Sequence, residues 1–399
     1  MAHIRFSTAG ESHGPALVAV IEGVPAGLPL AAADVDADLA RRQKGYGRGR
    51  RMQIEQDTIE LLSGVRAGET LGSPIAMLIR NKDWKNWSEI MDPAARPEDA
   101  AEGRKRVLTR VRPGHADLSG ILKYDRHDAR DILERASARE TTARVAAGAV
   151  ARRLLAELGI TIGSHVVHLG GIDAAVPASL PGDLNAAADA SPLRTLDKHA
   201  EALMITRIDE LKKAGNTAGG IAEVIVRGLP VGLGSHVSWD RKLDGRLARA
   251  ILSIPAVKGM EFGAGFDAAR KSGAEVHDEI EMAPGTPRTG NVRRRTNRAG
   301  GLEGGITTGE PLVVRAAMKP ISTLMTPLAT IDAATGEAAM AAAERSDVTA
   351  VPAMAVIAEA MTALVLADAV AEKFGGDSLG ELRQNFDDYL SHIAARLSR

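Results

Sequence analysis

A glycine-rich segment, residues 298–323, contains residue types that could hold a negatively charged ligand. Its glycines cluster around Glu303, and it ends in Lys319, Ser322 and Thr323. Glycine lets backbone N–H groups approach a ligand closely, and a lysine and two hydroxyls add charge and hydrogen bonds. The segment therefore predicts an anion-binding loop, with a plain glycine-rich hairpin carrying a surface lysine as the alternative.

Arginines are concentrated in three runs, at 41–51, 104–112 and 293–298, each next to a glycine or proline turn. The planar guanidinium fork matches carboxylate and phosphate groups, so these runs favour an anion pocket over an ordinary solvated basic face. A fourth pair, Arg135 and Arg139, flanks the predicted start of a helix over 135–158. Helix N-termini attract anions, which makes this a further candidate binding point, with surface arginines as the alternative.

Two histidines lie in glycine-flanked turns, His13 within 10–15 and His115 within 110–117. A histidine in such a turn is more often exposed than packed. Each is therefore either a functional side chain or part of a plain surface turn. Asp347 follows Arg345 closely, and the simplest interpretation of that spacing is an ion pair.

Composition describes an ordinary soluble globular protein. The chain has 399 residues, of which 45% are apolar and 25% charged, so we expect one large domain or two closely joined ones. It has no cysteine, which excludes disulfides and thiolate metal sites and suits a reducing compartment. A formal net charge of -1 gives no general attraction to nucleic acid. The N-terminus has no apolar leader and reads as mature protein, and the apolar run 350–371 predicts a buried helix rather than a membrane span.

Periodicity and turn signals predict mixed helices and strands. Strands are expected at 3–9, 16–22, 53–66, 73–80, 160–169 and 256–266. Further helices are expected at 34–42 with Asp34 as its N-cap, at 200–214, at 350–371 and from 377 onward. Irregular or surface segments are expected at 81–106 and 173–197, with a mobile basic loop at 267–298.

An internal repeat relates the two parts of the chain. The sequence VIEGVPAGL at 20–28 matches IVRGLPVGL at 225–233, and LAR recurs at 39–41 and 247–249. Each copy reads as strand, Gly-Pro-Gly turn and helix, which predicts one domain, 1–399, of two related halves with repeat copies near 18–41 and 223–249. Chance similarity is the alternative.

Six motifs in order resemble the chorismate synthase family. They are GESHG (10–14), RPGHAD (112–117), RASARET (135–141), NRAGGLEGGI (297–306), MKPIST (318–323) and RSDVTAVPA (345–353). The likeness covers nearly the whole chain and is weakest at 85–105, 173–197 and 267–296. It implies an α+β fold, a β-α-β sandwich with an internal pseudo-twofold repeat.

The resemblance also implies an activity. Family members are cytoplasmic lyases of the shikimate pathway, on the route to aromatic amino acids, and are commonly homotetramers. They convert 5-enolpyruvylshikimate 3-phosphate (EPSP) to chorismate and phosphate by a 1,4-anti elimination that requires reduced FMN. NADPH is a candidate reductant, because some members reduce FMN themselves and others rely on a separate reductase. No metal, membrane or nucleic acid is implied.

The resemblance implies a role for each residue that matches one of the family's motifs. His13 would protonate the departing phosphate, His115 would supply a proton to reduced FMN, and Asp347 would handle the proton at the flavin N5. The substrate-side arginines, some also associated with NADPH, are Arg42, Arg48, Arg112, Arg139 and Arg345. The FMN contacts are Arg135, Ala136, Ser137, Pro255, Ala256, Gly304, Lys319, Pro320, Ile321, Ser322, Thr323 and Arg345.

Three rival functions make different predictions. A phosphate- or nucleic-acid-binding module would have a basic pI and stacking aromatic residues, whereas this chain has a pI near 6.8 and 3% aromatic residues. A degenerate homologue would lack His13, His115 or Asp347, and all three are present. A flavin oxidoreductase would consume NAD(P)H in proportion to its product.

Overall fold

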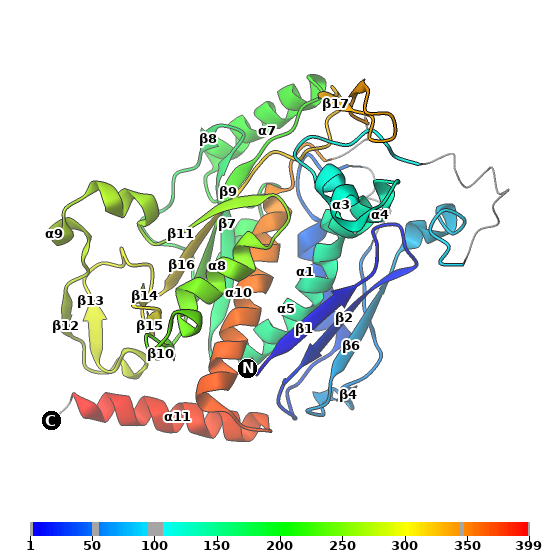
Figure 1. Cartoon of the computed structure of the whole chain (residues 1–399). Coiled ribbons are helices and arrows are strands. Elements are labelled where there is room, and N and C mark those ends of the chain that lie inside the picture. Colours follow the sequence, from blue (N-terminus) through cyan, green and yellow to red (C-terminus); the bar gives the residue numbers. More distant parts are fainter. Residues whose placement is uncertain (1–2, 50–55, 95–106, 343–346, 398–399) are drawn as a thin grey trace.

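Two antiparallel sheets enclose a layer of helices (Figure 1). The computed structural model describes residues 3–49, 56–94, 107–342 and 347–397. The first sheet has the order β1 (Arg5–Ala9), β2 (Ala16–Glu22), β6 (Ile75–Arg80) and β3 (Glu60–Leu61). The second has the order β11 (Val257–Phe262), β16 (Leu312–Met318), β9 (Gly220–Arg227), β7 (Thr161–Leu169) and β8 (Ile172–Asp173).

Four helices fill the space between the sheets: α1 (Ala32–Gln43), α5 (Thr141–Ala156), α8 (Leu243–Leu252) and α10 (Val351–Phe374). Helix α5 packs on β2 of the first sheet, α10 packs on β7 and β9 of the second, and α5 and α10 pack on each other. Each sheet therefore covers one side of the helices. The α+β class and the β-α-β sandwich implied by the family resemblance are confirmed.

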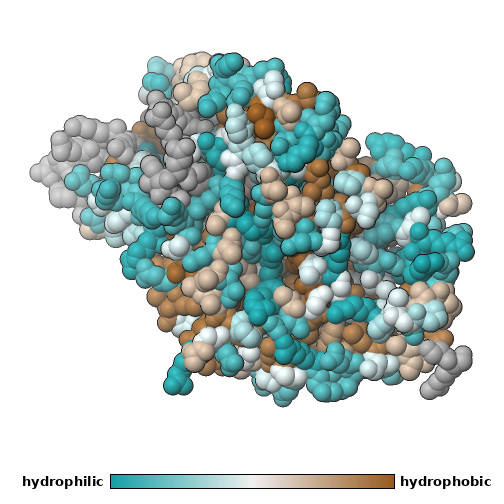
Figure 2. Space-filling view, turned by 180° about the vertical axis from the view of Figure 1, so that it is seen from behind, coloured by the Kyte–Doolittle hydropathy of each residue, from teal (hydrophilic) through white to brown (hydrophobic). Residues whose placement is uncertain are grey.

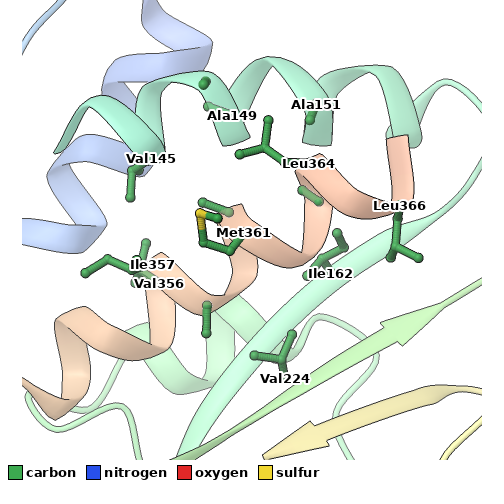
Figure 3. Close-up of a cluster of buried hydrophobic side chains, with 14 of the residues drawn as sticks. Val145, Ala149, Ala151, Ile162, Val224, Val356, Ile357, Met361, Leu364 and Leu366 are labelled. Carbon is green, nitrogen blue, oxygen red and sulfur yellow. The ribbon is translucent and has the colours of Figure 1, made fainter. Parts of the chain in front are cut away.

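The core is centred on α10. Side chains of α5, such as Val145, face Met361 and Leu364 of α10, and Ile162 of β7 and Val224 of β9 close the other side (Figure 3). Among the described residues one helix is long and apolar enough to cross a membrane, and it is α10, whose apolar window is 89% buried. The prediction of a buried helix is confirmed, and Pro352 lies in its first turn as expected.

Smaller elements surround this sandwich. The helices are α3 (Asp117–Tyr124), α4 (Arg130–Ala136), α6 (Leu184–Asp189), α7 (Lys198–Lys213), α9 (Gly273–Val276) and α11 (Leu379–Arg396). The strands are β4 (Val65–Arg66), β5 (Glu69–Thr70), β10 (Val231–Gly234), β12 (Ile280–Met282), β13 (Val292–Arg294), β14 (Leu302–Glu303), β15 (Ile306–Thr308), β17 (Ala329–Ile331) and β18 (Ala338–Met340).

The predicted continuous helix over 135–158 is wrong. Helix α4 ends at Ala136, Ser137 is extended with a ψ of 146°, and a short 3-10 turn, Ala138–Glu140, precedes α5. The Ser137 hydroxyl accepts the Arg139 N–H, a local bond that competes with helical pairing. The open helix N-terminus that the sequence predicted at Arg135 therefore does not exist.

Other boundaries differ for similar local reasons. Asp34 is the third residue of α1 rather than its N-cap, and its carboxylate accepts the Ala31 N–H at 2.8 Å. The described part of the predicted strand 53–66 is strand only at β3 and β4.

Two segments predicted as loops contain regular structure. The predicted loop 173–197 contains α6 and buried Leu193, and the predicted mobile loop 267–298 contains α9 and the β12–β13 hairpin. Ion pairs such as Arg293 to Glu281 link the strands of that hairpin.

The two copies of the sequence repeat share one turn geometry. In the first, the Thr70 hydroxyl accepts the Leu28 N–H at 2.9 Å and donates to the Pro25 carbonyl at 2.6 Å. In the second, Thr307 makes the same two bonds to the corresponding leucine and proline, at 2.8 and 2.7 Å. The glycine at the end of each strand has the same left-handed backbone, with φ of 84° and 81°.

A buried ion cluster joins the helical layer to the second sheet. Glu359 of α10 is 0% exposed and accepts hydrogen bonds from Arg41 of α1, Arg152 of α5 and Arg194, each at 2.7–3.0 Å. Burial by itself would raise the pKa of Glu359, but the three arginines outweigh it and lower the pKa to about 2. The ionised carboxylate therefore fixes α10 to three neighbouring segments.

Replacing Glu359 with Gln should destabilise the protein by about 3 kcal/mol at pH 7, because one buried and two partly buried arginines lose their shared anion. A carboxyl whose pKa is lowered on folding stabilises the protein above its unfolded value of 4.5, and this contribution fades as the pH falls toward 2. The difference between the two proteins in urea unfolding should therefore shrink below pH 4.5. Glu60→Gln, which breaks the exposed pair with Arg80, is the control and should cost under about 1 kcal/mol. A cost for Glu359→Gln no larger than this would contradict the assignment.

Gly148 sets the approach of α5 to α10. A Cβ at this position would lie 2.4 Å from the Cβ of Ala360. Helix propensity alone predicts that Gly148→Ala stabilises the protein by about 1 kcal/mol, whereas the steric overlap predicts a loss of about 1–3 kcal/mol. We expect the loss, measured as a lower Tm, and no comparable loss for Gly182→Ala, where an added Cβ meets nothing within 4 Å. A stabilised Gly148→Ala protein would contradict the close packing.

Candidate active site

Most of the predicted site residues lie at the end of the sandwich where α10 begins. Val348, just before this helix, donates its N–H to the Gly47 carbonyl at 2.8 Å and accepts the Ala218 N–H at 2.8 Å. The neighbouring Thr217 hydroxyl donates to the Ile321 carbonyl at 2.7 Å. These bonds bring the loop after α1, the start of β9 and the segment after β16 to one place.

His13 lies in the turn between β1 and β2, as predicted, and its position is set by Glu134 of α4. The His13 N–H donates to this carboxylate at 2.9 Å, and Nδ1 lies 2.8 and 2.9 Å from its two oxygens. The ring also stacks on Trp87 at a centroid distance of 3.9 Å. Burial by itself would raise the pKa of Glu134, but the bonds to His13 and the charge of Arg130 keep the pKa below its usual value.

His115 occupies a second turn, directly before α3. Its Nδ1 lies 2.5 Å from Asp117 Oδ1, and Arg112 binds the same carboxylate through Nε at 2.8 Å. Arg112 also donates to the Thr323 hydroxyl at 3.2 Å, which joins this turn to the segment after β16. Burial would raise the pKa of Asp117, but the hydrogen bonds from His115 and Arg112 hold the pKa far below its usual range.

Arginines from α1, its following loop and the α4–α5 connection form a cluster beside His13. Arg139 binds Asp57 at 2.6 Å and the Asn81 side chain at 3.0 Å, and Asn81 in turn donates to the carbonyl of Gly14, next to His13. Arg48 pairs with Asp347 at 3.2 Å. The sequence predicted these arginines but gave no signal for Asp57 or Asn81, which come from irregular segments.

Arg42 lies in the middle of this cluster, and its NH1 group is 3.8 Å from the nearest oxygen of Asp57, an ion pair too long for a hydrogen bond. Its NH2 group donates to the Ala138 carbonyl and the Thr141 hydroxyl, but NH1 donates no hydrogen bond within the described part of the chain. Burial lowers the pKa of Arg42 to about 9, Asp57 opposes this effect, and Arg48 and Arg139 add to it. A buried donor surrounded by like charges favours binding of an anion.

The predicted cofactor residues form two groups, and both groups lie at the end of the sandwich where α10 begins. Arg135 donates to the carbonyls of Thr8 and Gly10, and the Ser137 hydroxyl donates to Ser12, next to His13. At the second sheet, the Lys319 N–H donates to the Ala256 carbonyl at 2.9 Å, so the segments 255–256 and 319–323 lie side by side.

Lys319 fits a phosphate group. Its Nζ donates to the Gly114 carbonyl at 2.9 Å, and burial together with the charge of Lys258 lowers its pKa. An anion beside these two lysines would raise the pKa of Lys319 again. The donors of this segment therefore suit the phosphate of a bound cofactor such as FMN.

Two predicted residues are not brought into this group. Gly304 lies in the β14–β15 turn, beyond the Leu312 end of β16, whereas Lys319 follows its Met318 end. Seven strand residues separate the two ends by about 20 Å. Arg345 lies outside the described residues, as do the predicted basic residues at 50–51 and 104–106.

Two cavities adjoin the site. One of about 820 Å³ is lined by Glu134, Arg135 and Ala136 together with Ile90 and Met91. A smaller one of about 360 Å³ is lined by the loop 43–49 with Ile208, Asp209 and Lys212. The site therefore combines clustered guanidinium groups, two histidines on buried carboxylates and space for small molecules. Such a combination is typical of an enzyme that binds a small polyanion and transfers protons.

Comparisons with known proteins agree. A family model described as chorismate synthase matches residues 4–371. Chorismate synthase of Symbiobacterium thermophilum is 56% identical over 397 residues, covering 98% of this chain and 100% of that protein. That of a Thermus thermophilus strain is 57% identical over 392 residues, with the same coverage. A crystal structure of chorismate synthase matches with a TM-score of 0.79 and 43% identity over 98% of each chain. The chain belongs to the chorismate synthase family and is an enzyme.

The arginine cluster should bind inorganic phosphate. At a phosphate concentration ten times the dissociation constant, we expect about 1.4 kcal/mol of added stability, measured as a rise in Tm. Arg42→Gln should lose most of this rise, because it removes the central buried donor group. Arg80→Gln, in which the replaced arginine is exposed on β6, is the control and should keep the rise. An equal rise in all three proteins would show that phosphate binds elsewhere.

Proposed function

We propose that this chain converts EPSP to chorismate and phosphate by a 1,4-anti elimination in the presence of reduced FMN. The observation that carries the proposal is the buried cluster of Arg42, Arg48 and Arg139 beside His13, in a chain of this family. Such a cluster suits a substrate with one phosphate and two carboxylates, which together carry roughly three to four negative charges near neutral pH.

The arginines bind and orient the substrate in this proposal. Guanidinium forks pair with carboxylate and phosphate oxygens, and they remain charged when water is excluded. Arg42, Arg48 and Arg139 form one side of the binding site, and Arg112 approaches from the turn of His115. Arg345 completes the set by family resemblance alone.

Three side chains hold protons in the proposed reaction. His13 donates a proton to the departing phosphate, and histidine suits this task because it exchanges protons near neutral pH. His115 and Asp347 serve the proton exchanges on the cofactor side. Asp347 pairs with Arg48, so a carboxylate and a substrate-binding arginine are held as one unit.

The proposed FMN contacts are the two groups described above. They are Arg135, Ala136 and Ser137 from the α4–α5 connection, and Pro255, Ala256, Lys319, Pro320, Ile321, Ser322 and Thr323 from the second sheet. When bound, reduced flavin supplies reversible electron transfer that the side chains cannot provide. NADPH is the proposed reductant of the flavin, with Arg42 and Arg48 as its anion-binding residues. Gly304 remains a proposed contact on resemblance alone.

We further infer that the chain is one domain of two related halves. The matched hydrogen bonds of Thr70 and Thr307 support this, since chance similarity gives no reason for identical turn geometry. The order of elements also matches: β1, β2, α1, β6 and α5 correspond to β7, β9, α8, β16 and α10.

The proposed assembly is a homotetramer in the cytoplasm. Several hydrophobic side chains are exposed in the single chain, including Leu122, Trp239 and Phe266, and hydrophobic residues are interspersed with hydrophilic ones on the face in Figure 2. Contacts between copies would bury part of this surface.

An anaerobic incubation with EPSP and chemically reduced FMN tests the function. Phosphate and chorismate should appear in equal amounts, far exceeding the flavin added. Turnover with oxidised FMN and NADPH would add flavin reductase activity to the lyase. Binding of FMN without release of phosphate would overturn the proposed reaction.

His115→Ala should reduce turnover by about 100-fold or more, since a positioned acid contributes about that much. The fold should survive, because Arg112 continues to bind Asp117. FMN binding, measured by fluorescence titration, should be unchanged. His168→Ala is the control, because His168 pairs with an exposed aspartate, Asp173, outside the site. Normal turnover of His115→Ala would remove the acid role.

A further inference from the structure

Each of the two site histidines has a buried carboxylate behind its ring. Glu134 is 1% exposed at its side chain and Asp117 2%, whereas His13 and His115 are 19% and 18% exposed. The carboxylates are thus on the protein side and the rings on the solvent side. The two pairs come from unrelated segments, so the arrangement occurs twice independently in one site.

The short distances locate a hydrogen on Nδ1. An ionised carboxylate only accepts hydrogen bonds, and a bare ring nitrogen also only accepts. Two hydrogen-bond acceptors 2.8 Å apart at His13, or 2.5 Å apart at His115, would repel each other. At His115 the NH2 group of Arg112, which can only donate, also lies 3.1 Å from Nδ1, but the carboxylate oxygen is closer, so Nδ1 carries the hydrogen in both rings. In the neutral ring, Nε2 is then the nitrogen that can take up a proton.

An arginine keeps each carboxylate ionised. Arg130 NH1 lies 3.0 Å from Glu134, and Arg112 binds Asp117 through two of its nitrogens. The pKa values of both carboxyls lie below their usual range, because the hydrogen bonds from His13 and His115, together with these arginines, outweigh the effect of burial.

We propose that Glu134 and Asp117 are positioning residues, which keep the hydrogen on Nδ1 and so assign proton donation to Nε2 of His13 and His115. The proton donation rests on the proposed function, whereas the tautomer does not. Each carboxylate also holds its ring in one orientation.

Several positively charged side chains also lie near the two histidine rings. Arg130 lies over Trp87, on which His13 stacks, and Arg112 approaches His115 Nδ1 at 3.1 Å. Lys319 binds the carbonyl of Gly114 next to His115. Each of these cations lies near a ring whose Nδ1 is directly bonded to a carboxylate.

Hydrogen exchange at the histidine C2 position, followed by mass spectrometry across pH, tests the inference. This rate changes when the ring is protonated. In Glu134→Gln the pH dependence of exchange at His13 should change, while that at His115 stays the same. In Asp117→Asn the converse is expected. An unchanged pH dependence at the partner histidine in both variants would overturn the proposal.

Asp173→Asn provides the matched control, because Asp173 is 90% exposed at its side chain and bonds His168 Nδ1 at 2.7 Å. This variant should leave turnover and the pH dependence of exchange at His13 and His115 unchanged. A shift at His13 or His115 in the control would mean that the method reports general changes, and would overturn the interpretation.

The tautomer can also be read in the unmodified protein, which covers the case in which a buried variant does not fold. Solid-state 15N spectra of protein labelled at histidine, with His13→Ala and His115→Ala used to assign signals, should show the Nδ1–H form of both rings at high pH. The Nε2–H form at either ring would overturn the proposal for that residue.

The pH dependence of turnover provides a further test, because loss of a purely structural residue would lower kcat without changing its pH dependence. The pH dependence of kcat should change in Glu134→Gln, and Glu134→Asp should restore part of the original profile because the charge returns. An unshifted profile with reduced kcat would leave Glu134 structural and overturn its positioning role. If no variant and no parent protein releases phosphate, the proposed reaction fails while the exchange and 15N measurements still decide the tautomer.

Discussion

The contact between α5 and α10 determines where most of the other parts lie. Gly148 allows the two helix backbones to approach closely at Ala360, and Glu359, the residue before it on α10, binds arginines from α1 and α5. Sterics thus set the spacing of the helices, and the buried ion cluster sets their orientation. Because one sheet packs on each helix, the same contact also fixes the distance between the sheets.

The active-site end of the sandwich depends on that arrangement. Residues just before α10 bond both to the loop that carries Arg48 and to the start of β9, so a shift of α10 would move two walls of the site. The break at Ser137 between α4 and α5 places Arg135 and Arg139 on different sides of the connection, one toward β1 and the other toward Asp57. A continuous helix would not do this.

Charge in the site is distributed unevenly by depth. Ionised carboxylates lie behind the histidines, whereas the buried NH1 group of Arg42 makes no hydrogen bond within the described residues and is available to an anion. The favourable free energy of folding elsewhere in the protein offsets the free energy cost of burying this positive charge. A polyanion that binds here is attracted more strongly than it would be in water, because charges interact more strongly where water is excluded.

The sequence by itself determined the elements with strong periodicity and the identity of the functional groups. The buried helix α10, the strands β2 and β7, and the two histidine turns follow from local pattern and from the family's motifs. Only the tertiary structure decided the break at Ser137, the helix within 173–197 and the hairpin within 267–298, because a side-chain bond or distant packing stabilises each of them. The partners of the site residues also came only from the fold. Asp57 and Asn81 lie in irregular segments with no motif, and Glu134 differs from an ordinary helical glutamate only because the chain brings His13 to it.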